Sequence, residues 1–183
     1  PPDTRSWHPT LGFRVGTEQP MGSIETGRSH YDNFGFGSTL GLQLELPFSR
    51  NFGVQLWGYQ GKLTGTIICP DCKGTTMAGG VALVYHILDG VPIDPWFSGG
   101  FGYRSTKYDR IDNTGLKLDY TGVVAPRFSF GADYYLIPQV GIGASLDLSF
   151  GRYYDRSPSA IPRDSGDVHS FVGGGLRIVL RPF

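Results

Sequence analysis

The sequence lacks long apolar runs, an excess of charge of either sign, and more than one pair of cysteines. No run approaches the roughly 20 apolar residues of a membrane-spanning helix. The formal net charge is zero, which argues against a nucleic-acid partner because neutralising phosphates needs a basic excess. Charged residues make up 17% of the chain, below the approximately 25% of soluble domains. The 183 residues suit one domain, spanning 1–183.

Alternating apolar and polar residues recur along the chain instead. The apolar members of the two clearest segments are Leu40, Leu42, Leu44 and Leu46, and later Ile142, Ala144, Leu146, Leu148 and Phe150. Successive side chains of a strand point to opposite faces, so one face of each segment is apolar and the other polar. Such segments are typical of a β-barrel with lipid outside and a polar lumen, because only closed barrels and helices satisfy their backbone in a bilayer.

We predict an antiparallel, up-and-down, eight-stranded transmembrane β-barrel. The expected strands are 9–17, 34–46, 52–62, 76–88, 96–108, 116–137, 140–154 and 168–183. Pro126 cannot donate to a ladder, so we expect a bulge or break there. Short turns alternate with four long loops, Met21–Asn33, Lys62–Thr75, Asp109–Gly115 and Asp155–Asp167. This asymmetry predicts extracellular loops, with both termini periplasmic.

Aromatic residues near the predicted strand ends suggest two interfacial girdles. The turn side holds Phe48, Phe52, Trp96, Phe97, Tyr134 and Tyr135, and the loop side holds Tyr31, Phe34, Tyr108, Tyr120, Tyr153 and Tyr154. The alternative is a soluble barrel of the lipocalin kind, with the apolar face inside. The inward set is dominated by Gly, Ser, Thr and charges, which would make a poor soluble core and favours the membrane barrel.

The chain resembles the small bacterial outer-membrane barrels of the OmpA, OmpX and OmpW type in this pattern, over nearly its whole length. The resemblance implies location in the outer membrane, with lipid and lipopolysaccharide around the barrel. It also implies that the terminal Phe183 is an assembly signal for the barrel-assembly machinery. The sequence departs from the usual signal, because Arg181, Val179 and Arg177 occupy the alternating positions that are normally apolar.

Charged side chains on the predicted inner face form a lumen cluster, consisting of Arg14, Glu45, Arg104, Arg127, Asp133, Asp147 and Arg177. We expect Asp147 to lie between Arg127 and Arg177, and Arg14 to reach Gln43 or Glu45. An eight-stranded barrel is just wide enough for its own side chains, so paired charges would close the lumen. A gated pore or a ligand-binding lumen is the alternative.

The two cysteines, Cys69 and Cys72, fall in a loop expected outside the cell. A disulfide suits that oxidising compartment. A metal site would need two further ligands, for which His30 and His86 are candidates, and free thiols are the third alternative.

No catalytic site or cofactor is predicted. His169 and Ser170 are adjacent, so a regular strand points them to opposite faces, whereas a base and its nucleophile must meet. We therefore expect a non-enzymatic barrel with a structural or surface-interaction role, and a larger outer-membrane protein as one type of partner. A narrow channel or carrier, as the OmpW resemblance suggests, and a lipid-modifying enzyme remain the alternatives.

Overall fold

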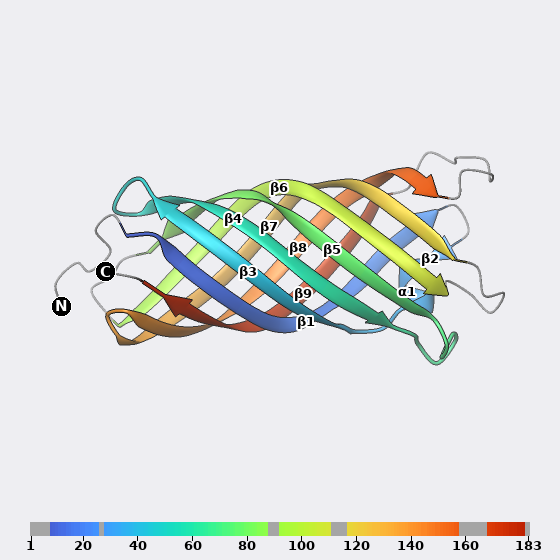
Figure 1. Cartoon of the computed structure of the whole chain (residues 1–183), viewed down its shortest axis with the longest axis horizontal. Coiled ribbons are helices and arrows are strands. Elements are labelled where there is room, and N and C mark those ends of the chain that lie inside the picture. Colours follow the sequence, from blue (N-terminus) through green and yellow to red (C-terminus); the bar gives the residue numbers. More distant parts are fainter. Residues whose placement is uncertain (1–7, 26–27, 88–91, 111–116, 158–167, 182–183) are drawn as a thin grey trace.

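The computed structural model describes residues 8–25, 28–87, 92–110, 117–157 and 168–181. They form one closed antiparallel barrel in which each strand pairs with the next and β9 pairs back with β1 (Figure 1). The strands are β1 (Thr10–Glu25), β2 (Arg28–Ser29), β3 (Gly37–Pro47), β4 (Phe52–Thr64), β5 (Lys73–His86), β6 (Ile93–Arg110), β7 (Leu118–Ile137), β8 (Val140–Ser157) and β9 (Val168–Leu180). Eight of them make the wall, and β2 is a short addition to the end of β1.

The predicted eight-stranded barrel is thus confirmed, and its faces follow the predicted alternation. Leu40 and Leu42 of β3 are exposed on the outer face, as are Leu146 of β8 and Leu176 of β9. Their sequence neighbours on the inner face are buried or half-buried. The period of two therefore separated the outer surface from the lumen correctly.

One loop prediction, Met21–Asn33, was wrong. β1 runs on to Glu25, β2 pairs with it, and the four-residue helix α1 (His30–Asn33) follows. Pro20 lies in β1, where the strand still pairs with β9 but its pairing with β3 has ended at Glu18. A proline is tolerated at such an edge because no neighbour there needs its missing N–H.

The predicted irregularity at Pro126 is confirmed. β7 continues through this residue as one strand, but its register with β6 and with β8 shifts there. The bulge leaves the alternation intact on both sides, with Val124 and Arg127 both buried. A bulge of this kind re-aims side chains without ending the strand.

The loop-side aromatic girdle was largely mispredicted. Phe34, Tyr108, Tyr120 and Tyr153 are all buried in the barrel interior. On the turn side, Phe48, Phe52, Phe97 and Tyr134 are exposed as expected, but Trp96 is buried in the lumen. The girdles were predicted from the closeness of the aromatic residues to strand ends alone. The alternation of inward and outward positions, which that prediction ignored, places Tyr108 and Tyr120 on the inner face. The side chain of Tyr31 lies outside the described part.

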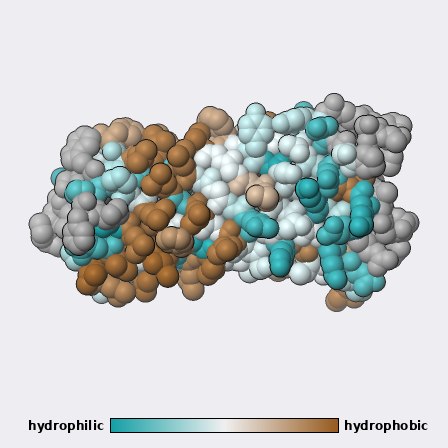
Figure 2. Space-filling view, viewed as in Figure 1, coloured by the Kyte–Doolittle hydropathy of each residue, from teal (hydrophilic) through white to brown (hydrophobic). Residues whose placement is uncertain are grey.

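The outer surface divides into two halves along the barrel. Figure 2 shows apolar residues gathered over the half nearer the termini, and a largely hydrophilic surface toward the loop end. The longest strand, β7, has 20 residues, and at a rise of about 3.3 Å per residue and a tilt of about 40° it covers roughly 50 Å of barrel height. The apolar band of such barrels is only about 25 Å tall, so the loop-end half of the wall projects beyond it.

Exposed polar side chains cover this projecting half, among them Gln60 and Lys62 of β4, Lys107 of β6 and Asp119 of β7. No helix among the described residues is long and apolar enough to cross a bilayer.

Leu146 tests this division, because its side chain is 67% exposed in the apolar half. We expect Leu146→Arg to lower the free energy of unfolding by about 2–4 kcal/mol, since a lipid-facing arginine near the midplane is costly. The measurement is reversible urea unfolding in phospholipid vesicles. Gln60→Arg, in the polar half, is the control and should change stability little. Equal losses in the two variants would show that the bilayer does not lie where the apolar band indicates.

Candidate functional site: a charge-filled lumen

The structure places all seven residues of the predicted lumen cluster inside the barrel. Six are nearly inaccessible to solvent, and the side chain of Asp147 is 12% exposed. Among the described residues, five arginines and five carboxylates face the lumen. They are Arg14, Arg104, Arg127, Arg177 and Arg181, with Glu18, Glu45, Asp94, Asp133 and Asp147. Buried charges are tolerated only when they are paired, so their arrangement determines what the lumen can do.

Asp147 of β8 lies midway along the lumen and contacts several polar side chains there. Its Oδ2 lies 2.5 Å from Arg14 Nη2, and its Oδ1 accepts hydrogen bonds of 2.5 Å from Arg127 Nη2 and from the Ser129 hydroxyl. The Arg127 guanidinium also stacks on the Trp57 ring, 4.3 Å from its centroid. One carboxylate thus joins strands β1, β7 and β8 across the lumen.

Arg104 of β6 extends this arrangement toward the loop end. Its Nη2 donates to the Tyr59 hydroxyl and lies 3.8 Å from Glu18, and Tyr59 donates a 3.0 Å hydrogen bond to the same carboxylate. Its guanidinium lies over the Phe171 ring at 3.3 Å. We call Arg14, Glu18, Tyr59, Arg104, Arg127 and Asp147 together the mid-lumen cluster.

Glycine makes room for these long side chains. At Gly175 of β9, an added Cβ would lie 3.0 Å from Arg14 Nε and closer still to the backbone of β1. An eight-stranded barrel has little interior space, so a large side chain on one strand requires a small one opposite.

The predicted partners of Arg177 and Arg14 were wrong. Arg177 does not contact Asp147 but forms a two-pronged pair with Asp133, and its Nη1 donates a 2.9 Å hydrogen bond to Gln43. Arg14 pairs with Asp147 rather than with Gln43 or Glu45. Long side chains cross the lumen, so adjacency of strands did not determine the pairs.

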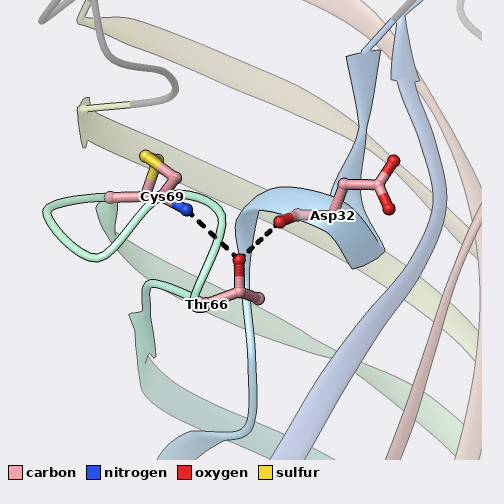
Figure 3. The surroundings of a disulfide bond; sticks show 4 residues. Asp32, Thr66 and Cys69 are labelled. Carbon is pink, nitrogen blue, oxygen red and sulfur yellow. Dashed lines mark hydrogen bonds between the residues drawn. A yellow bond between two sulfur atoms is a disulfide. The ribbon is translucent and has the colours of Figure 1, made fainter.

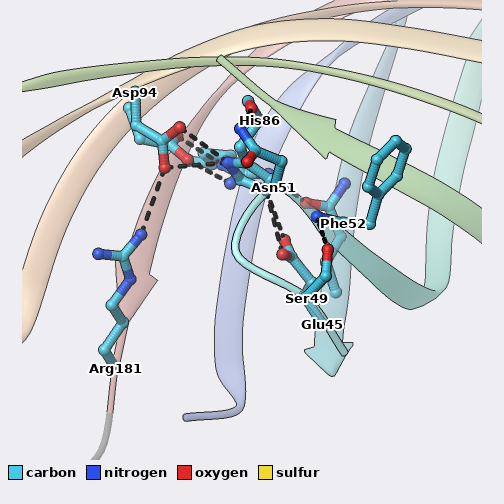
Figure 4. Close-up of polar contacts among 10 residues, drawn as sticks. Glu45, Ser49, Asn51, Phe52, His86, Asp94 and Arg181 are labelled. Atoms are coloured by element: carbon cyan, nitrogen blue, oxygen red, sulfur yellow. Dashed lines mark hydrogen bonds and ion pairs between the residues drawn. The ribbon is translucent and has the colours of Figure 1, made fainter. Parts of the chain in front are cut away.

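A second network closes the end of the lumen that carries the short turns (Figure 4). His86 of β5 lies between two carboxylates, with Nδ1 2.8 Å from Asp94 and Nε2 3.0 Å from Glu45. Arg181 Nη2 lies 3.3 Å from Asp94 Oδ2. Both ring nitrogens of His86 thus lie within hydrogen-bonding distance of a carboxylate oxygen. We call Glu45, His86, Asp94 and Arg181 the turn-end network.

The opposite end is filled by an apolar cluster, the aromatic cap. Its members are Phe34, Leu63, Cys69, Cys72, Tyr108, Leu118, Tyr120 and Tyr153, all buried. Neighbouring rings touch, with centroids 5.0 Å apart for Phe34 and Tyr108 and 5.1 Å for Tyr120 and Tyr153. The chain entering β3 thus folds over the mouth of the barrel, and Gln19 fixes it by donating to the Phe34 carbonyl at 2.8 Å.

Cys69 and Cys72 form a disulfide in the β4–β5 loop, and both cysteines are buried in the aromatic cap. The Thr66 hydroxyl ties this loop to α1 by donating to the Asp32 carbonyl at 2.5 Å, and it accepts from the Cys69 N–H at 3.4 Å (Figure 3). Among the residues that the structure describes, no group of three or more His, Cys, Asp or Glu is placed to hold a metal. The side chain of His30, the other metal candidate, lies outside that part.

His169 and Ser170 lie on opposite faces of β9. His169 is buried and stacks on the Tyr153 ring, with centroids 4.0 Å apart, whereas Ser170 is on the outer face. These two side chains therefore do not meet as base and nucleophile. Phe183, the predicted assembly signal, is outside the described residues.

Sequence reasoning missed three charged members of the lumen, Glu18, Asp94 and Arg181, and the aromatic Trp57. Glu18 and Trp57 follow the alternation of β1 and β4, and would have been found by extending it beyond Thr17 and by reading every inward position. Asp94 was assigned to a turn, but it lies on the inner face of β6, opposite Asp133 in the ladder.

Asp147→Asn tests the central role of this carboxylate. We expect a loss of about 3–5 kcal/mol of unfolding free energy, because two buried guanidinium groups lose their shared counter-charge. Asp119→Asn is the matched control: Asp119 is 52% exposed and lies 3.9 Å from Lys107, so its loss should be below about 1 kcal/mol. Urea unfolding in vesicles measures both. Similar, small losses would show that the lumen does not depend on Asp147.

Comparison with known proteins supports the fold and not a specific role. No protein-family model matches the sequence, and no curated protein matches it significantly. Many solved structures match nearly the whole chain, among them the three that follow. The Neisserial surface protein A has a TM-score of 0.63 and 11% identity, covering 95% of this chain and 97% of its own. The outer membrane protein AlkL, solved in lipid bilayers, has a TM-score of 0.56 and 12% identity, covering 96% of this chain and 91% of its own. The attachment invasion locus protein Ail of Yersinia pestis has a TM-score of 0.52 and 14% identity, covering 93% of this chain and 98% of its own.

These identities are too low to transfer an activity, but the shared architecture is complete. Together with the apolar band and the polar lumen, these matches show that the chain has the fold of the small eight-stranded bacterial outer-membrane β-barrels.

Proposed function

We propose that the chain is a non-enzymatic barrel whose lumen is closed and whose projecting loop end carries its function through contacts with other molecules. The observation that carries this proposal is the filling of the lumen at three levels. The turn-end network, the mid-lumen cluster and the aromatic cap follow one another along the barrel. Ion passage would require each level to open.

The middle level leaves little room for a solute. Two cavities adjoin the mid-lumen cluster, each of about 10 Å³, which is about the space for one water molecule. Asp147 holds Arg14 and Arg127 in place, and Glu18 lies beside Arg104. Moving any of these side chains aside would unpair a buried charge, which costs several kcal/mol. This cost opposes a channel that opens by thermal motion.

The β4–β5 loop supports a role in surface interaction. The disulfide and the Thr66 hydrogen bonds hold this loop against α1. Its tip nevertheless exposes two isoleucines, Ile67 at 98% and Ile68 at 67%. Apolar side chains on a rigid tip are preorganised for binding a partner, because little conformational freedom is lost on binding.

We further propose that the loops face the outside of the cell and that the termini are periplasmic. The first residues of β1 and the last of β9 pair at the same end of the barrel as the short β3–β4 and β7–β8 turns (Figure 1). In this orientation lipopolysaccharide surrounds the apolar band at its loop-side edge. Phe183 would serve the barrel-assembly machinery, and a larger outer-membrane protein would be a suitable partner.

Conductance tests the closed lumen. We expect the purified protein, inserted into planar bilayers, to show no steady single-channel current, because no level of the lumen offers a continuous aqueous path. A general porin in the same bilayer is the control for insertion and recording. Steady, voltage-independent openings from this protein would contradict the proposal and favour a narrow channel.

Labelling of intact cells tests the orientation separately. A membrane-impermeant maleimide should modify Lys107→Cys, whose parent side chain is 66% exposed on the projecting wall. Arg50→Cys, in the β3–β4 turn, should react only after the outer membrane is permeabilised. The native cysteines are joined to each other and should give no background. The opposite labelling pattern would refute extracellular loops.

A further inference from the structure

We infer that the lumen holds a single small monovalent anion, of the size and chemistry of chloride, between Arg14 and Arg127. The first observation is local charge balance. In the mid-lumen cluster, Arg14, Arg104 and Arg127 face only two carboxylates, Glu18 and Asp147. The cluster thus carries one excess positive charge, even with both acids ionised.

The neighbouring groups do not supply the missing negative charge. Arg177 and Asp133 neutralise each other through two hydrogen bonds. In the turn-end network, two carboxylates face Arg181 and a His86 whose two ring nitrogens both contact carboxylate oxygens. Glu45 and Asp94 are thus engaged at the turn end by His86 and Arg181. The excess charge therefore stays at Arg14, Arg104 and Arg127, in an interior where an uncompensated charge is costly.

The second observation is a cavity of about 10 Å³ whose lining suits an anion. Arg14 and Arg127 line it together with Gln43, Trp57 and Tyr59, and no carboxylate is among its lining residues. The other cavity beside the cluster differs in this respect, because Glu18 and Asp147 both line it. An anion in the first cavity would face the two guanidinium groups on a side that Asp147, their shared partner, does not line.

The third observation is a set of buried N–H donors without an acceptor among the described residues. They are Arg14 Nε, Arg127 Nη1 and Trp57 Nε1, and all three side chains line this cavity. Leaving a buried donor unpaired costs free energy, more so on a charged group. One acceptor in the cavity would satisfy several of them, and a negatively charged acceptor would also remove the excess charge.

A water molecule is the competing occupant, since it fits the same space and accepts hydrogen bonds. Water would satisfy the donors but leave the excess charge in place, so the charge balance favours the anion. The lumen is filled on both sides of the cavity by the aromatic cap and the turn-end network. The ion would therefore be captured when the barrel closes during folding, rather than by later exchange.

Bromide identifies the occupant directly, because it replaces chloride and scatters anomalously. The full chain is refolded from urea into detergent in sodium bromide and crystallised. We expect one anomalous peak inside the barrel, within hydrogen-bonding distance of Arg14 and Arg127. Density at that place without an anomalous signal, or no density, would overturn the inference in favour of water or an unoccupied cavity.

Gln43→Glu provides the matched variant. A carboxylate at this position lines the cavity, keeps an oxygen to accept from Arg177, and supplies the negative charge from the chain itself. We expect the bromide peak to disappear in Gln43→Glu and to persist in Gln60→Glu, the same change on the outer wall. A peak that persists in Gln43→Glu would contradict the assignment.

Thermal unfolding gives a second readout that needs no crystals. At equal ionic strength, the wild-type chain and Gln60→Glu should unfold at a higher temperature in sodium chloride than in sodium gluconate, because only the smaller anion fits the folded state. Gln43→Glu should show no such difference. Equal midpoints in the two salts for the wild-type chain would overturn the inference, whether or not Gln43→Glu folds.

Discussion

The structure depends on one constraint, which is that charges inside a narrow barrel must find their partners within it. Asp147 shows this most directly, because it serves Arg14 and Arg127 at once and so connects β1, β7 and β8 through the lumen. Such pairs do not by themselves guarantee net stability, since desolvating the ions costs about as much as their attraction returns. Breaking one pair is nevertheless expensive, and this makes the arrangement of side chains specific. The barrel is thus stabilised along its wall by the β-ladders and across its lumen by side-chain contacts.

The two ends of the lumen are closed by different chemistry. At the turn end, His86 joins two carboxylates and Arg181 completes the network. At the loop end, tyrosines and phenylalanine replace charges, and the disulfide loop packs into the same apolar cluster. That end projects beyond the apolar band, so a compact cluster of rings excludes water where no lipid covers the wall. The rigid scaffold leaves the outer surface of the loops as the part free to contact other molecules.

The alternation of residues was enough to predict the barrel, its eight strands and the inward position of Arg14, Asp147 and the other five residues of the predicted lumen cluster. It could not predict which charges pair, because long side chains such as Arg177 reach across the lumen to partners fixed by the register and tilt of distant strands. The girdle at the loop end was mispredicted because Tyr108, Tyr120 and Tyr153 lie near strand ends but on inward positions. The first strand was predicted to end at Thr17, although β9 continues to pair with Pro20 and Gly22 beyond it.

The polar side chains fill a lumen that neither lipid nor bulk water reaches. Trp57 and Trp96 report on it directly, because both are buried inside and stack with Arg127 and Arg177. The measurement is tryptophan fluorescence of the Trp7→Phe protein in vesicles, with brominated acyl chains as the lipid quencher and acrylamide as the aqueous one. We expect weak quenching by both. Strong quenching by brominated lipid would place these rings on the outer surface, and strong quenching by acrylamide would reveal a water-filled lumen, so either result would contradict it.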